Sequence, residues 1–247
     1  MSSRLKLLSA LALVLVIGGG VAFVAWYTGR DDADLVAALP DVSTTSPIAT
    51  TSEPQGSTPS SSAPTTTPSA STDGLWGLQP GDRDTFYVGY QVEETLRGLD
   101  VTATGTTGRY EGSMVADGTT IRDFTIAVDM TTIESDEGRR DSRMRTDGLE
   151  TDEFPTATFT LTEPLTLPTT PVIGEQVDAT INGDLELHGV TNPVTIAVQA
   201  RWNGDTVDVT GEIPIVLGDY GIEPPQLSFV SVRDTGKVVF VVRFARP

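Results

Sequence analysis

The sequence predicts an all-β fold, a sandwich or an up-and-down barrel, interrupted by one short helical insertion. From Gly74 onward, apolar and polar residues alternate in short segments separated by Gly, Asp and Asn, which is the pattern of half-buried antiparallel strands. Between residues 139 and 145 the charged residues instead recur four apart, as on one face of a helix. Eight or more strands at short spacing, with helical periodicity nearly absent elsewhere, favour a sandwich or a barrel.

An apolar segment, residues 7–27, lies near the start of the chain and carries no charge. A run of about 20 apolar residues is long enough to cross a bilayer as a helix. Arg4 and Lys6 precede the run, and Trp26 and Tyr27 end it as an interfacial aromatic pair. The sequence therefore predicts a single-span transmembrane anchor.

The basic side of this anchor is expected to stay in the cytoplasm, so residues 1–6 are a cytoplasmic start and the rest is extracytoplasmic. A secretory signal peptide is the alternative, because residues 20–22 form a candidate cleavage site, and the protein would then be secreted. Residues 28–73 are rich in Ser, Thr and Pro and hold little apolar bulk. We expect them to form a disordered stalk that precedes one folded domain, residues 74–247.

Composition excludes several functions. The net charge of -18 should repel nucleic acid, and the absence of cysteine excludes disulfides, thiol catalysis and cysteine zinc sites. His188 is the only histidine and lies in a reverse-turn sequence, and no G-x-S-x-G pattern occurs, so a hydrolase triad is hard to assemble. We expect His188 to be a structural turn residue whose ring hydrogen-bonds locally or meets solvent.

Acidic residues cluster at Glu134, Asp136 and Glu137, without the D-x-[DN]-x-[DN]-G frame of a calcium loop. A solvated acidic turn is the more frequent outcome for such a cluster. We therefore expect no metal, no cofactor and no catalytic residue. A metal-free hydrolase with two carboxylates facing each other across a cleft is the remaining enzymatic alternative.

The first half of the domain is expected to hold five strands and then the helix. Each strand places its apolar residues two apart, and Asp117 and Gly118 mark one of the turns between them. The helix must end before Pro155, because the residue preceding a proline is biased away from helical backbone. The five expected strands cover residues 76–78, 86–92, 101–108, 110–116 and 121–130.

The second half is expected to hold five more strands. A reverse turn over residues 188–193 separates two of them, and a second turn follows at Asn203 and Gly204. The last strand is apolar on both faces, which is typical of a central or seam-closing strand. The expected strands cover residues 157–165, 177–187, 194–202, 207–215 and 237–244.

Bulky side chains on these alternating faces either fill a core or line a pocket. A core is the usual outcome, whereas a barrel of about eight strands is just wide enough to hold one small ligand. A long acyl or isoprenoid tail gains about 0.8 kcal/mol per buried methylene, so it binds tightly without charge or catalysis. The lumen candidates are Phe86, Val88, Tyr90, Phe124, Phe159, Val198, Trp202 and Phe240.

Four segments occur in the order YQVEETL, RRDSRMRTDGLETDEFPTATFT, GDLELHGVTNPVTI and DYGIEPP. Together they resemble the YceI-like family of lipocalin-like, polyisoprenoid-binding proteins, over essentially all of residues 74–247. The resemblance implies an antiparallel eight-stranded barrel, a helix packed near one opening, and a long apolar ligand in the lumen.

Two positions depart from the family pattern, in which histidine is common where this chain has Glu94 and Arg143. The paired change suggests that Glu94 and Arg143 form an ion pair at the barrel mouth. Arg140, Asp141 and Arg145 match the family, and they either cap the barrel or hold a polar or phosphorylated head group, since arginine suits bidentate phosphate contacts. Capping is favoured, because an acidic protein often uses clustered arginines to neutralise neighbouring carboxylates.

The sequence thus predicts a membrane-tethered, extracytoplasmic barrel that is not an enzyme and that binds a polyisoprenoid or another long-chain lipid. The alternative is a structural or adhesive surface domain whose barrel is packed and empty of ligand. Nothing in the sequence sets an oligomeric state.

Overall fold

A computed structural model of the chain describes residues 38–40, 71–227 and 230–247. The predicted transmembrane segment, residues 7–27, and nearly all of the predicted stalk lie outside the described residues. Within the part that is described, no helix combines the length and the apolarity needed to span a bilayer.

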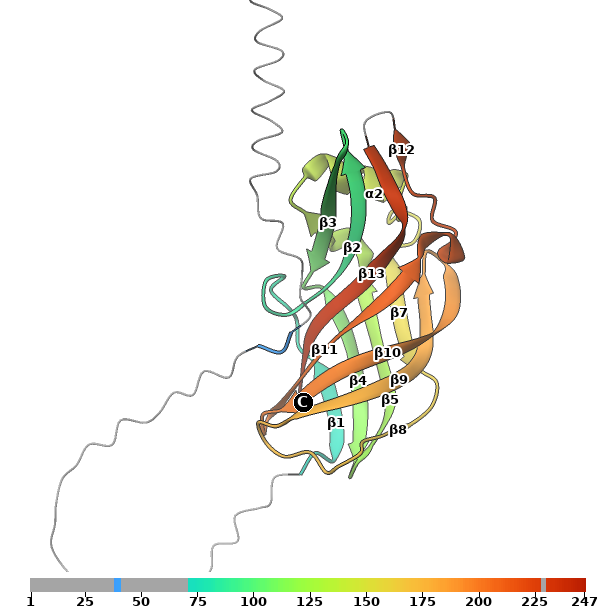
Figure 1. Cartoon of the computed structure of the whole chain (residues 1–247). Coiled ribbons are helices and arrows are strands. Elements are labelled where there is room, and N and C mark those ends of the chain that lie inside the picture. The colour runs from blue at the N-terminus through green and yellow to red at the C-terminus, as the bar shows by residue number, and fades with distance from the viewer. Residues whose placement is uncertain (1–37, 41–70, 228–229) are drawn as a thin grey trace, which may run out of the picture. The chain divides into compact units, whose positions relative to one another are not determined.

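Eight antiparallel strands close on themselves to form a barrel (Figure 1). Their order around the ring is β1, β4, β5, β7, β9, β10, β11 and β13, and the pairing of β13 with β1 closes it. The barrel, and not the sandwich, is therefore the correct one of the two predicted architectures. The ring strands are β1 (Gly74–Leu78), β4 (Tyr110–Asp117), β5 (Thr120–Asp129), β7 (Thr156–Leu161), β9 (Gln176–Leu187), β10 (Val190–Trp202), β11 (Thr206–Val216) and β13 (Val230–Ala245).

A hairpin extends the sheet beyond this ring. Strand β2 (Tyr87–Leu96) pairs with β13, and β3 (Leu99–Thr107) joins β2 to the short β6 (Glu134–Ser135). The described helix, α2 (Gly138–Thr146), follows β6 and lies beside the ends of β2 and β3 in Figure 1, which confirms the predicted helical insertion. The remaining short elements are η1 (Met130–Thr132), β8 (Leu165–Thr166), η2 (Leu217–Tyr220) and β12 (Gln226–Leu227).

The turn between β9 and β10 is tighter than the sequence suggested. Its two central residues, His188 and Gly189, have φ angles of 53° and 72°. Positive φ at both central residues is the mark of a type I′ turn, whose twist matches that of the flanking strands. The predicted reverse turn is therefore present, but its predicted extent over residues 188–193 is wrong, because β10 already begins at Val190.

Two strands, β10 and β13, begin four or more residues earlier than predicted. Pro193 lies inside β10, which is tolerated because pairing with β11 begins only at Val198 and leaves β10 an edge strand at the proline. Strand β13 was expected over residues 237–244, yet it begins at Val230. Its first part is mostly polar and exposed and pairs with β2. A bulge between Val232 and Gly236 interrupts the ladder, so the alternation of Val230 and Val232 does not continue into the rest of the strand.

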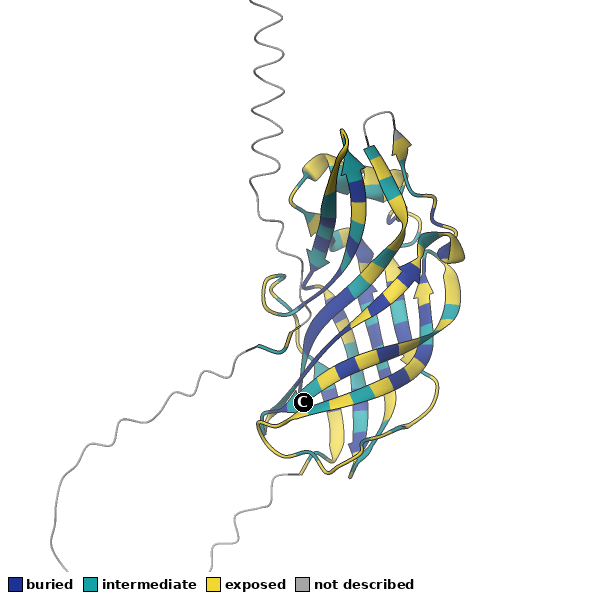
Figure 2. Ribbon diagram, viewed as in Figure 1, coloured by how far each residue is buried: buried dark blue, intermediate teal, exposed yellow. Residues whose placement is uncertain are grey.

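Buried and exposed residues alternate along the ring strands (Figure 2). The inner face carries one large buried cluster with residues from all eight ring strands and from β2. In β13, Phe240 and Phe244 belong to this cluster, whereas Val239 and Val241 join Tyr87 in a smaller cluster on the opposite face. The last strand is thus apolar on both faces, as its sequence predicted.

Candidate functional site

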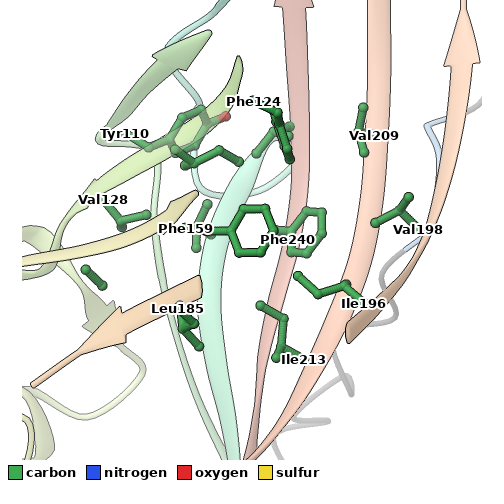
Figure 3. Close-up of a cluster of buried hydrophobic side chains, with 14 of the residues drawn as sticks. Tyr110, Phe124, Val128, Phe159, Leu185, Ile196, Val198, Val209, Ile213 and Phe240 are labelled. Atoms are coloured by element: carbon green, nitrogen blue, oxygen red, sulfur yellow. The ribbon is translucent and has the colours of Figure 1, made fainter. Parts of the chain in front are cut away.

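The structure brings seven of the eight predicted lumen residues together on the inner face of the barrel. Figure 3 shows Phe159 and Phe240 close to Ile213, Ile196 and Leu185, which come from neighbouring strands. Six candidates are buried in the inner cluster and a seventh, half-buried, packs against it; they are Val88, Phe124, Phe159, Val198, Trp202, Phe240 and, half-buried, Tyr90.

Phe86, the eighth candidate, lies apart from this group. It precedes β2 and packs against the smaller cluster on the opposite face of the sheet, where the guanidinium of Arg243 lies 4.3 Å from the centre of its ring. The strand begins only at Tyr87, so the alternation that leads from Val88 inward does not extend back to Phe86.

Three inner aromatic rings lie against glycines of the neighbouring strand. A Cβ atom added to Gly211 would come within 2.7 Å of Cζ of Phe240, and one added to Gly105 within 2.9 Å of Cζ of Tyr90. The ring of Phe159 lies over Gly183 in the same way. A ring that rests on a glycine lies along the wall of the barrel, so it projects less toward the barrel axis than a ring held away by a side chain.

The inner aromatics also contact one another. The ring centre of Phe124 lies 5.7 Å from that of Phe159 and 5.7 Å from that of Phe244. Strands β5 and β13, which carry Phe124 and Phe244, are not paired in the sheet, so this second contact joins separate parts of the wall. At this level aromatic side chains pack against one another inside the barrel.

A charged cluster lies where α2 meets β2. One nitrogen of the Arg140 guanidinium is 3.2 Å from Oε1 of Glu94, and the other terminal nitrogen binds Asp136, four residues earlier in the chain. The Glu94 and Arg140 side chains are only 9% and 14% exposed, so water screens this ion pair weakly. We call Glu94, Asp136, Arg140 and Asp141 the α2 cluster.

The predicted pair between Glu94 and Arg143 does not form. Arg143 and Arg145 are exposed, and Arg140 takes the place expected for Arg143. Asp141 accepts hydrogen bonds from the backbone and the hydroxyl of Ser135, which holds the first turn of α2 against β6. The spacing of Asp136 and Arg140 was the available sequence signal, since residues four apart share a helix face.

We expect Glu94 to couple energetically to Arg140 and not to Arg143. In a double-mutant cycle of Glu94→Ala with Arg140→Ala, unfolding free energies should deviate from additivity by about 1–3 kcal/mol, because a shielded contact is shared. The matched cycle of Glu94→Ala with Arg143→Ala should be additive. Urea unfolding measures both, and equal coupling in the two cycles would contradict the observed pairing.

The hydroxyl of Tyr90 is buried and makes no hydrogen bond within the described part of the chain. Burial raises the pKa of Tyr90 above its usual value; Arg140 opposes the shift, and the carboxylates of the α2 cluster add to it. The Tyr90 ring packs against the inner apolar cluster, so this residue lies between the apolar interior and the charges. The sequence predicted an inner aromatic here but carried no signal for the unpaired hydroxyl.

His188 is a structural turn residue, as the sequence predicted. The prediction that its ring hydrogen-bonds locally or meets solvent is wrong, because both ring nitrogens bind residues distant in sequence and the side chain is largely buried. Its Nε2 lies 2.8 Å from a carboxylate oxygen of Glu150, and its Nδ1 lies 3.0 Å from the backbone oxygen of Tyr220. The ring centre is 4.2 Å from that of Phe154. His188 thereby ties the β9–β10 turn to the segment after α2 and to η2.

Replacing His188 by alanine should lower the free energy of unfolding by about 2 kcal/mol, since two hydrogen bonds and a ring contact disappear. Asparagine tolerates positive φ better than alanine does, so His188→Asn separates the ring from the backbone conformation. Chemical denaturation should show a loss for both variants, somewhat smaller for His188→Asn because asparagine suits the backbone conformation. A near-native His188→Asn would show that the ring contributes little.

The acidic residues ahead of α2 serve the structure. Glu134 pairs with Arg83, Asp136 pairs with Arg140, and the Glu137 side chain accepts a hydrogen bond from the backbone of Arg139 at the start of α2. Among the described residues, no group of three or more histidines, cysteines or carboxylates has the arrangement of a metal site.

The chain is similar to proteins of one family. The model of the YceI-like domain matches residues 82–244. A UPF0312 protein of Vibrio vulnificus is 32% identical over 106 residues, which are 39% of this chain and 51% of that protein. Protein YceI of Escherichia coli is 31% identical over 105 residues, which are 40% of this chain and 51% of that protein. The chain thus spans about half the length of these curated relatives.

A solved structure has the same fold. It is the structure of a polyisoprenoid binding domain from Saccharophagus degradans implicated in plant cell wall breakdown, and it superimposes with a TM-score of 0.54. The match covers 70% of this chain and 98% of that domain, at 18% sequence identity. At this identity the likeness is one of fold.

Proposed function

The chain belongs to the YceI-like domain family, and we propose that its barrel binds a long apolar lipid of the polyisoprenoid class without transforming it. The observation that carries the proposal is the closed sheet whose inner face is apolar on every ring strand. The domain from Saccharophagus degradans, which is named for polyisoprenoid binding, shares this fold and supports the choice of lipid.

The chemistry of the inner face suits such a ligand. An isoprenoid tail offers methyl and methylene groups and no hydrogen-bonding atoms, and each buried methylene contributes about 0.8 kcal/mol. The rings of Phe159 and Phe240 lie along the wall on Gly183 and Gly211, which favours an extended chain passing beside them. Affinity would then come from buried apolar area, with the polar end of the lipid setting its orientation.

A packed, ligand-free barrel with a structural or adhesive role is the second candidate. The contact between Phe124 and Phe244 favours it, because these rings join unpaired strands and fill the interior between them. A barrel filled in this way along its whole length would hold no lipid.

Extraction of the purified full-length chain distinguishes the two candidates. The chain is expressed in a bacterial host, extracted with organic solvent, and analysed by mass spectrometry beside bulk lipid from the same membranes. We expect a stoichiometric isoprenoid or other long-chain species, enriched over the bulk lipid. An extract that matches the bulk lipid, from a protein that also takes up no added polyprenol, would support the packed barrel.

We also propose that the barrel works outside the cytoplasm, tethered by residues 7–27. The support is the sequence alone: the segment is apolar, uncharged and preceded by basic residues. Protease added to intact cells should then remove the barrel, while a cytoplasmic marker survives. Barrel protected from protease until the cells are lysed would place it on the inner side.

A further inference from the structure

The boundary between the apolar interior and the α2 cluster holds an unused hydrogen-bonding group. Tyr90 comes from β2, where it pairs with Gly105 of β3, and Gly105 pairs in turn with Ser135 of β6. This row of the sheet lies next to α2, because Ser135 binds Asp141 in the first turn of the helix. The Tyr90 ring faces the apolar cluster, and its buried hydroxyl has no partner among the described residues.

A buried hydroxyl without a partner carries a free-energy cost, and such a group in a native structure is often completed by a ligand or water. Tyr90 is well placed for a lipid whose tail lies among the inner aromatics, because the hydroxyl marks where the apolar wall ends. The position would suit the polar end of the lipid.

The charges around the Tyr90 hydroxyl determine which kind of lipid head group can bind there. Arg140 is the one cation of the α2 cluster, and it is bound to two of the carboxylates, Glu94 and Asp136, while Asp141 adds a third. Three carboxylates against one guanidinium leave the surroundings of Tyr90 negative. A phosphate or diphosphate would meet this charge in a shielded place, where repulsion is strong.

We propose that Tyr90 receives the polar end of the bound lipid and that this end is an uncharged oxygen, a carbonyl or an alcohol, and not a phosphate. The phenol donates a hydrogen bond to that oxygen. The α2 cluster then serves as a selectivity element that rejects anionic lipids. This inference rests on the proposed lipid binding and names the class of ligand within it.

Four probes with the same geranylgeranyl-type tail test the idea: a naphthoquinone, an alcohol, a diphosphate, and the hydrocarbon without a head. Binding to the delipidated full-length chain in detergent micelles is followed by the change in intensity and emission maximum of tryptophan fluorescence, since Trp202 lies in the inner cluster. The quinone quenches this emission, whereas the other three probes alter it by changing the surroundings of the indole. Each probe partitions into the micelles equally for every variant, so ratios between variants report binding to the protein.

We expect the quinone and the alcohol to bind the wild-type chain more tightly than the diphosphate does. Tyr90→Phe should weaken the binding of the quinone about 2- to 10-fold, the range for one neutral hydrogen bond, and leave the affinity for the hydrocarbon unchanged. Glu94→Gln should reduce the difference in affinity between the quinone and the diphosphate, because it removes one negative charge from the α2 cluster. Tyr87→Phe is the matched control, because Tyr87 lies on the same strand but packs in the cluster on the opposite face.

The outcomes separate this inference from the proposed function. Binding of all the probes with no effect of Tyr90→Phe on the quinone, or tightest binding of the diphosphate, overturns the assignment of the polar end and leaves lipid binding intact. Failure of every probe, the hydrocarbon included, overturns lipid binding itself.

Discussion

The Arg243→Ala variant is expected to lose about 3 kcal/mol of unfolding free energy, the largest stability change that a single polar contact should cause here. Arg243 on β13 faces Asp208 on β11, and its Nε and one terminal nitrogen lie 2.6 and 2.9 Å from the two carboxylate oxygens. Hydrogen bonding to Asp208 raises the pKa of Arg243 above its usual value.

The size of the effect follows from unequal burial. Asp208 is 1% exposed, so removing its partner leaves a carboxylate in a shielded place with one remaining hydrogen bond, from Asn203 at 3.1 Å. Breaking a buried pair typically costs about 3–5 kcal/mol, and Arg243 is itself partly exposed, which favours the lower end.

The matched control lies on the same two strands. Lys237 on β13 also forms an ion pair with Glu212 on β11, from a diagonal position of the ladder, but both side chains are about half exposed. Lys237→Ala should therefore cost less than about 1 kcal/mol. Unfolding by urea at low salt measures both variants, because urea is uncharged and does not screen the ion pairs as guanidinium chloride would. Equal losses of unfolding free energy in the two variants would mean that water replaces the hydrogen bonds that Arg243 makes to Asp208. The burial of Asp208 would then contribute little to the effect.

The Gly211→Ala variant should lose about 1–3 kcal/mol of stability and much of its bound lipid. Gly211 pairs directly with Phe240, whose ring covers it, and an added methyl group would stand 2.7 Å from Cζ of that ring. The nearest backbone atom, the oxygen of Ala197, would be 3.0 Å away, so the ring must give way first. A displaced ring moves toward the barrel axis, into the volume that an isoprenoid tail would use.

Gly77→Ala is the matched control for this experiment. Gly77 is also a strand glycine, in β1, but an added Cβ would meet no atom within 4 Å. Lipid extracted per folded protein, together with the urea midpoint, separates occupancy from stability. Loss of stability in Gly211→Ala with full lipid occupancy would place the lipid away from Phe240. Equal urea midpoints and equal lipid contents in Gly211→Ala and Gly77→Ala would mean that the Phe240 ring moves without a free-energy cost.

Much of the fold could be predicted because strand periodicity is a local property. The alternation around Phe124 and Val128, or around Ile181 and Leu185, marks both the strand and its inner face. The helix was equally local, with its charges four residues apart. The start of β13 was not predicted, because most of its residues are polar and its ladder is interrupted ahead of Gly236.

The candidate site was predicted less completely than the fold. Inner aromatics such as Phe159 and Trp202 follow from the same alternation, so their placement needed no tertiary information. The partner of Glu94 did not follow, because α2 carries four arginines and only the docking of the helix on β2 and β6 selects Arg140.

By itself, the sequence determined the all-β class, the helical insertion, most strand faces and the family, because each depends on the order of residue types along the chain. Only the tertiary structure decided how β13 pairs with β1 to close the barrel and which glycines lie under aromatic rings of the neighbouring strands. It also decided that Arg243 pairs with the buried Asp208. It also decided that the hydroxyl of Tyr90 ends without a partner beside the α2 cluster. These features depend on which residues contact one another between strands that are far apart in the sequence. Neither the spacing of residues nor the composition determines those contacts.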